Sequence, residues 1–301
     1  MSVLKSNILL LLAAAIWGFA FVAQRMGMEY VGPFTFNGVR FLLGSLSLAP
    51  LVLWNEKNFQ YNDSSKQHLK QALKAGLFAG AVLFLGASLQ QIGLVYTTAG
   101  KAAFITCLYI VLVPLLGIFL KQYISTSTWM GAMLAVLGLY FLCMKDNSLS
   151  FSYGEMLELA GTFFWAIHIL VIDHFSRKVD VLQLSLFQFI TCSAFSLLTA
   201  LCIETINIDT LRQALLPILY GGICSVGVAY TLQACAQKNT QPSHAAIILS
   251  LETVFAPIGG WLLLNETLSI REALGCLIML LGMLLSQLQN VKKTKLDHTN
   301  R

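Results

Sequence analysis

Two tryptophans and a glutamate stand inside long apolar runs of the sequence, where polar side chains are costly. Trp17, Trp165 and Glu252 each lie near the middle of such a run, and a charged side chain at the centre of a membrane helix costs about 2.5–3.5 kcal/mol. A carboxyl group held there can take up a proton or pair with a cationic solute; the alternative is a glutamate that only braces its helix. Aromatic walls with a few polar groups are typical of a small-molecule pocket, although aromatic stripes also serve plain packing.

A second set of polar residues lies in the apolar run near residue 40. Arg40 follows Asn37 by three residues, so in a helix the two side chains share a face. A guanidinium suits a carboxylate or phosphate group on a substrate; the alternatives are pairing with a helix carbonyl or with Glu29. Lys101 lies near the end of another run, where its long side chain is expected to snorkel to the membrane interface.

Further candidates follow from helical spacing. His244, Ile248 and Glu252 are four residues apart, so a continuous helix would place all three on one face. Glu252 and His244 are therefore the candidates for proton coupling, with interfacial packing as the alternative for His244. The candidate substrate-binding residues are Trp17, Phe21, Gln24, Asn37, Arg40, Gln90, Tyr109, Trp165, His168, Tyr230, Gln233 and Glu252.

The elements that must position these residues are membrane helices. Of the 301 residues, 57% are apolar and 11% are charged, against about 45–50% and about 25% in soluble domains. The mean hydropathy of +0.73 excludes a water-soluble fold, and the continuous apolar runs exclude the alternating pattern of a β-barrel. At roughly 20 residues for each span, the chain has room for ten helices. The expected helices are 7–25, 33–54, 70–94, 98–120, 127–144, 153–175, 182–203, 213–236, 243–264 and 270–288.

The placement of Lys and Arg predicts the orientation, since cytoplasmic loops carry an excess of both. With the N-terminus inside the cell, thirteen of these residues fall on the cytoplasmic side and five on the outer side. Both termini are therefore expected in the cytoplasm, including a short polar tail at 289–301. The same asymmetry explains the net charge of +5, so we expect membrane lipid and no nucleic acid as a partner.

The sequence contains an internal repeat. Residues 97–104 (TTAGKAAF) match residues 240–247 (TQPSHAAI) at an offset of 143. Offsets of 148 and 144 extend the match; the pairs are Trp17 with Trp165, Arg40 with Gln188, Gly131 with Gly275, and Gly138 with Gly282. Because five spans in each half is an odd number, the second half must cross the membrane in the opposite sense. Inverted repeats are typical of carriers that open a shared midplane site to each side in turn; the alternative is chance alignment of short apolar stretches.

Motifs of other protein classes are missing from the sequence. There is no HExxH, no Walker A sequence and no GxSxG, since residues 222–227 read GICSVG. Seven cysteines are scattered singly and predict no disulfide framework. We therefore expect no enzyme, no metal and no cofactor. A pore or lipid scramblase is the other alternative, and it would not require inverted halves around one site.

Four stretches carry a resemblance to a known family: AIWGFAF at 15–21, NGVRF at 37–41, SLETVFAPIGGWLLLNE at 250–266 and GCLIMLLG at 275–282. Their order and duplication resemble the drug/metabolite transporter superfamily, in particular bacterial proteins with two EamA-type repeats. The family often has Pro directly after the Glu of its ninth helix. Here Thr253 follows Glu252 and Pro257 comes four residues after Thr253, so the role of that kink is in doubt.

The resemblance implies ten helices in two inverted five-helix repeats, 7–144 and 153–288, around a central cavity, with the last helix of each half peripheral. We expect an all-α integral membrane protein of the bacterial cytoplasmic membrane, a secondary transporter of a small organic metabolite. Export of amino acids or related compounds is the leading hypothesis, with uptake of a metabolite second and an integral-membrane enzyme third. The GxxxG of Gly76 and Gly80 and the glycines of the peripheral helices predict packing seams and leave a homodimer open.

Overall fold

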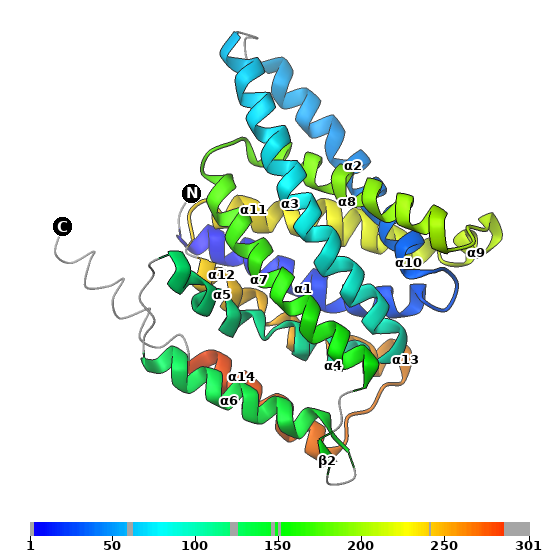
Figure 1. Ribbon diagram of the computed structural model, residues 1–301, viewed down its shortest axis with the longest axis vertical. Coiled ribbons are helices and arrows are strands. Elements are labelled where there is room, and N and C mark those ends of the chain that lie inside the picture. The colour runs from blue at the N-terminus through cyan, green and yellow to red at the C-terminus, as the bar shows by residue number, and fades with distance from the viewer. Residues whose placement is uncertain are drawn as a thin grey trace, which may run out of the picture.

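The computed structural model is built almost entirely of helices (Figure 1). It describes residues 3–58, 63–120, 126–145, 148–149, 152–240 and 242–285; the predicted tail at 289–301 lies outside them. Within these residues, eight helical spans are long and apolar enough to cross a membrane. The last helix of each half is shorter, and together they give the ten predicted helices.

The two halves contain corresponding helices. The first half comprises α1 (Val3–Gly27), α2 (Pro33–Asn58), α3 (Asp63–Tyr96), α4 (Ala99–Thr106), α5 (Tyr109–Gly117), η1 (Ile118–Leu120) and α6 (Thr126–Cys143). The second comprises α7 (Tyr153–Ser176), α8 (Val181–Ile203), α9 (Ile208–Gln213), α10 (Leu215–Leu219), η2 (Tyr220–Tyr230), α11 (Thr231–Gln237), α12 (Pro242–Leu249), α13 (Glu252–Leu264) and α14 (Ile270–Leu285). Between them, β1 (Met144–Lys145) and β2 (Ser148–Leu149) form a short antiparallel pair with Met144 opposite Leu149.

Three expected helices differ from the sequence prediction in their detail. The fourth and ninth were expected to be continuous, but each is divided in two, as α4 and α5 and as α12 and α13. The eighth is composed of α10, η2 and α11, and η2 has the wider winding of a π-helix. Such winding occurs frequently at functional sites. A short additional helix, α9, precedes it.

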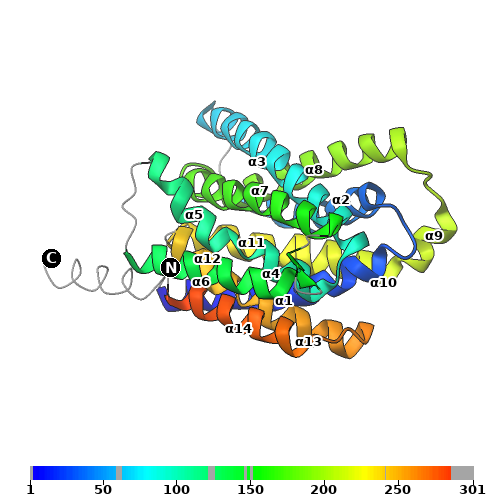
Figure 2. The same ribbon diagram turned by 60° about the horizontal axis from the view of Figure 1, so that its bottom comes forward.

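The two halves interleave rather than fold separately. α1 packs against α13 and η2, α2 against α8, α3 against α7 and α8, and α6 against α14. Each of these pairs joins one helix from each half. Figures 1 and 2 show α6 and α14 side by side along one edge of the molecule. Side chains in the interior therefore contact residues of the opposite half.

The predicted glycine seams lie between helices of the same chain. A Cβ built on Gly80 of α3 would lie 2.5 Å from the Cβ of Thr191 on α8. One built on Gly282 of α14 would lie 2.7 Å from the carbonyl oxygen of Gly131 on α6. Only glycine permits these close helix approaches. The glycines thus join the halves at two separate places.

The outside of the helical bundle is apolar, as a lipid-facing surface requires. Trp54, Phe119, Leu201 and Trp261 are among the many large apolar side chains that are exposed. Helix backbones satisfy their own polar groups, which is what permits such a surface in lipid. The protein is a multi-pass integral membrane protein.

Candidate functional site

The divided helices have the same local geometry in both halves. The N–H of Leu108 bonds to the carbonyl oxygen of Ile105, and the N–H of Leu251 bonds to that of Ile248. These bonds reach back three residues instead of four, so the chain winds more tightly at each break. Leu108 and Leu251 are 143 residues apart, which is the offset of the repeat. The breaks are therefore a property of the repeat itself.

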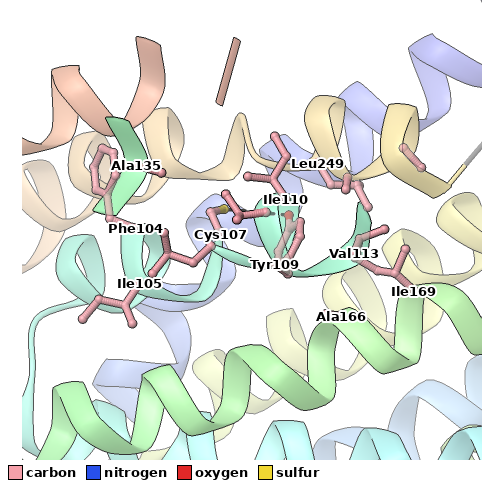
Figure 3. Packing of buried hydrophobic residues seen from close by; sticks show 14 of the residues in the cluster. Phe104, Ile105, Cys107, Tyr109, Ile110, Val113, Ala135, Ala166, Ile169 and Leu249 are labelled. Atoms are coloured by element: carbon pink, nitrogen blue, oxygen red, sulfur yellow. Dashed lines mark hydrogen bonds between the residues drawn. The ribbon is translucent and has the colours of Figure 1, made fainter. Parts of the chain in front are cut away.

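The two breaks meet at Glu252, the first residue of α13. Tyr109, its counterpart in the first half, donates from its hydroxyl to Oε1 of Glu252 at 3.1 Å. The thiol of Cys107 lies 3.1 Å from the same oxygen. Figure 3 shows Cys107 and Tyr109 on the two sides of the first break, with Leu249 of the second half nearby. A carboxyl group from one half is thus held by the broken helix of the other.

A cavity lies beside this meeting point. The space that the centres of water molecules can occupy in it is about 40 Å³, which is room for a few waters. Its walls come from both halves. They consist of Trp17, Phe21, Gln24, Arg40, Gln90, Thr106, Tyr109, Trp165, His168, Ile169, Ser225, Tyr230, Gln233, Leu249 and Glu252. Eleven of the twelve candidate substrate-binding residues are in this set, and Asn37 is the exception.

Arg40 brings a buried cation to the cavity wall. Its side chain is 2% exposed, and it belongs to none of the ion pairs that the described residues form. Its Nε donates to Oδ1 of Asn37 at 2.9 Å, while Nδ2 of Asn37 donates to the carbonyl oxygen of Ala87. Its guanidinium carbon lies 4.9 Å from the centre of the Phe41 ring. Asn37 therefore positions Arg40, and the expected alternative of pairing with Glu29 is wrong.

Aromatic rings form the wall between the halves. The ring of Tyr230 lies 4.7 Å from that of Trp17, centre to centre, and 6.3 Å from that of Trp165. Nε1 of Trp17 donates to the carbonyl oxygen of Ser225 at 3.3 Å. Nε1 of Trp165 is buried and has no partner among the described residues. The two tryptophans thus meet around Tyr230, which is itself one of the candidate substrate-binding residues.

Amides and one histidine complete the polar lining. Nε2 of Gln90 donates to Oε1 of Gln24 at 3.2 Å. Nε2 of His168 lies 2.9 Å from Oε1 of Gln188, the repeat counterpart of Arg40. These bonds fix side chains from three helices at the cavity.

His244 lies away from the cavity. The break after Leu249 interrupts the helical spacing, so His244 and Glu252 do not share a helix face as expected. Nε2 of His244 lies 3.1 Å from Oδ1 of Asn7 on α1 instead. We call this region, where α1 and α12 begin, the His244 end.

The opposite region, where α4, α7 and α14 begin, we call the Lys101 end. Nζ of Lys101 lies 2.7 Å from a carboxylate oxygen of Glu272 and 3.5 Å from one of Glu155. Lys101 therefore forms ion pairs, and its snorkelling to the membrane interface stays a prediction. The carboxylate of Glu266 accepts the N–H of Ala99 at 3.0 Å, across the halves. A wider polar pocket of about 420 Å³ lies here.

Four lining residues escaped the sequence prediction: Thr106, Ile169, Ser225 and Leu249. Thr106 and Leu249 are repeat counterparts, and each ends the helix that precedes a break. The duplication of the segments around 97–104 and 240–247 was the available signal for them. Ile169 and Ser225 carry no signal beyond their place in apolar runs. Among the described residues, no group of three or more His, Cys, Asp or Glu could hold a metal ion.

Comparisons with known proteins agree with this architecture. The chain is 31% identical to an uncharacterized transporter of Archaeoglobus fulgidus over 95% of its length and 87% of the relative's. It is 23% identical to the uncharacterized transporter YoaV of Bacillus subtilis, over 90% and 92%. A protein of known crystal structure shares the fold at 17% identity, with a TM-score of 0.71 and coverage of 94% and 96%. The model of the EamA-like transporter family matches twice, at residues 4–144 and 152–288. The chain therefore belongs to the EamA-like transporter family.

Proposed function

We propose that the protein is a secondary transporter that exports amino acids or closely related metabolites across the cytoplasmic membrane by alternating access. The observation that carries this proposal is the cavity at the meeting of the two halves. Arg40 on α2 and Glu252 on α13 bring opposite charges to the same small space. A solute with both a carboxylate and an amino group complements such a pair.

The carboxylate of the solute would bind Arg40. A guanidinium presents paired N–H donors that match a carboxylate, and this one has no acidic partner among the described residues. The free N–H of Trp165 is a further donor in the same wall. A buried cation without a counter-ion is costly, so the bound anion supplies what the protein lacks.

The amino group of the solute would bind at the other side of the cavity. Glu252 is the carboxyl group there, and the rings of Trp17 and Tyr230 can accept a cation on their faces. The same carboxyl can carry a proton when the amino group has left. This competition between solute and proton at one group would couple export to a proton gradient, with the proton returning inward.

Export is favoured by the difference between the two ends. The charge bias of the loops predicts that the His244 end faces the cytoplasm. At that end His244 contacts Asn7 through a neutral hydrogen bond, and Arg177, whose ion pair lies within α7, reaches only a carbonyl oxygen of the other segment, that of Thr240. At the Lys101 end, ion pairs join different helices. The end that is easier to open would then load solute from the cytoplasm. A cavity of about 40 Å³ requires such an opening before a solute can enter.

The test is transport by the purified protein in proteoliposomes. A panel of labelled amino acids and their decarboxylated amines is offered in counterflow, with and without a pH gradient. We expect saturable counterflow of one or more amino acids and none of the matching amines. Arg40→Gln should lower the apparent affinity about 10- to 100-fold, the loss of one charge-assisted contact. Arg212→Gln is the control, because the Arg212 side chain is 77% exposed and does not line the cavity.

The outcomes separate the alternatives. Flux that does not saturate would indicate a pore. Equal transport of amines, or full affinity in Arg40→Gln, would refute the carboxylate site. Glu252→Gln should remove the response to a pH gradient, and an unchanged response would refute proton coupling at Glu252. If a proton gradient directed into the vesicles makes the labelled solute accumulate inside them, the protein is an uptake carrier instead of an exporter.

A further inference from the structure

A second buried carboxyl group lies near the cavity and has no role in the function proposed above. Glu158 on α7 is 1% exposed. Its Oε2 accepts a hydrogen bond from Oγ1 of Thr106 at 3.1 Å, and its Oε1 is buried with no partner among the described residues. Glu158 belongs to none of the ion pairs of the described part of the chain. Burying a carboxylate in this way is costly unless the group is protonated.

The position of Glu158 favours a bound proton for a second reason. Thr106 is the last residue of α4, so the carboxyl group lies at the C-terminal end of that helix. Helix C-termini carry a partial negative charge. Oγ1 of Thr162 donates to the carbonyl oxygen of Ile105 at 3.0 Å, which adds no donor for Glu158. The surroundings thus repel an anion and accommodate a neutral acid.

The repeat supplies an internal control for this pair. The counterparts of Glu158 and Thr106 are Leu10 and Leu249, at offsets of 148 and 143. Leu10 and Leu249 are completely or almost completely buried in one apolar cluster. The fold therefore packs well at this position with two leucines. A polar pair that packing does not need points to a ligand.

The location connects the Lys101 end to the cavity. Glu155, one turn before Glu158 on α7, lines the polar pocket at the Lys101 end. Thr106, which binds Glu158, lines the central cavity together with Glu252. The next residue, Cys107, contacts Glu252 directly. Two consecutive residues at the break thus each touch one of the two buried carboxyl groups.

We propose that Glu158 is a proton-binding site that passes protons between the Lys101 end and the cavity. The proton is held in an O–H bond on the carboxyl group of Glu158. When that bond breaks, the proton crosses the cavity and forms the O–H bond of Glu252, which leaves Glu158 as the carboxylate until it is reprotonated from the Lys101 end. The use of this proton in transport rests on the proposed function, whereas its binding does not.

Few other titratable groups surround Glu158. On α4, Lys101 is bound to Glu155 and Glu272. On α3, Gly93 packs against Glu158, and Tyr96 packs against Gly154. On α5, Tyr109 is bound to Glu252. Variants of these neighbouring groups can therefore distinguish the titration of Glu158 from theirs.

The test is infrared difference spectroscopy of the full-length protein in lipid bilayers, between acidic and alkaline buffer, without any solute. We expect a carboxylic C=O band that is lost in Glu158→Gln and kept in Glu252→Gln. Glu155→Gln is the matched control on the same helix, because Glu155 is ion-paired with Lys101 and its replacement should leave the band assigned to Glu158 in place. A spectrum of Glu158→Gln identical to that of the original chain would refute the proposal.

A double variant guards against a folding defect. Thr106→Leu with Glu158→Leu copies the pair that the other half already packs, so we expect unchanged helix content by circular dichroism and loss of the same band. Sodium chloride added at constant pH, against choline chloride, should leave the band in place; loss of the band with sodium alone would identify a sodium site and overturn the proton assignment. If no solute of the transport panel is transported, the proposed function is refuted. The infrared band of Glu158 would still be present, because proton binding does not depend on transport.

Discussion

The two ends of the protein are built on the same geometry with different chemistry. At the Lys101 end, α4 of the first half is bound to α7 of the second by Lys101 and Glu155. At the His244 end, the repeat counterparts of these residues are His244 and Asn7, and they too are in contact, at 3.1 Å. One contact is an ion pair and the other a neutral hydrogen bond. Glu272 adds a second carboxylate to the Lys101 contact.

An inverted repeat can acquire a preferred direction from such a difference between its two ends. Identical ends would open with equal ease, because the pseudo-symmetry makes the two states equivalent. The ion pairs at the Lys101 end are mostly buried, since the Lys101 side chain is 16% exposed. Charge-assisted bonds of this kind contribute about 1.5–3 kcal/mol each, against about 1 kcal/mol for neutral ones. We therefore expect the unequal ends to bias the resting state toward opening at the His244 end.

The largest expected effect comes from reversing the charge at the Lys101 end. Lys101→Glu removes both ion pairs and places a further carboxylate beside Glu155 and Glu272. Removing one partner of a buried pair costs about 3–5 kcal/mol, so α4 should open at least about 100-fold more often. Hydrogen–deuterium exchange of the α4 amides measures this directly. Arg212→Glu, at an exposed ion pair, is the control and should leave α4 unchanged.

A smaller effect is expected when the His244 end receives the chemistry of the other end. Asn7→Glu with His244→Lys should create an ion pair where the neutral bond stands. A gain of about 1.4 kcal/mol would slow exchange of the α12 amides about tenfold and slow turnover in counterflow. His244→Lys alone lacks the acidic partner and should not slow exchange. If exchange of the α12 amides is the same in the single and double variants, an ion pair in place of a neutral hydrogen bond does not account for the difference between the ends.

The smallest expected effect is the response to salt. Raising ionic strength from 0.1 to 1 M shortens the Debye length from about 10 to about 3 Å, although buried pairs are screened less. Exchange in α4 should rise about twofold, whereas exchange in α12 should not change. An equal response at both ends would contradict the difference between the ion pairs of Lys101 and the neutral hydrogen bond of His244.

Much of the site was predictable because the bilayer makes polar residues conspicuous. Trp17, Trp165 and Glu252 stood out inside apolar runs, and all three line the cavity. Arg40 was found in the same way, and Asn37 was found by its spacing although it acts through Arg40. His244 was misplaced because helical spacing holds only within a continuous helix, and this helix is divided between Leu249 and Glu252. The break that separates it from Glu252 contains no Gly or Pro at residues 250 and 251.

Ten membrane helices in two inverted halves follow from the residues alone, because hydropathy and duplicated motifs depend only on the order of residues along the chain. Only the tertiary structure decided which groups bind one another. The breaks at Leu108 and Leu251, the contact of Tyr109 with Glu252 and the partners of Lys101 all join segments more than 50 residues apart or depend on packing against them. Such contacts arise because the halves interleave, and helical periodicity carries no information about which faces of distant helices meet.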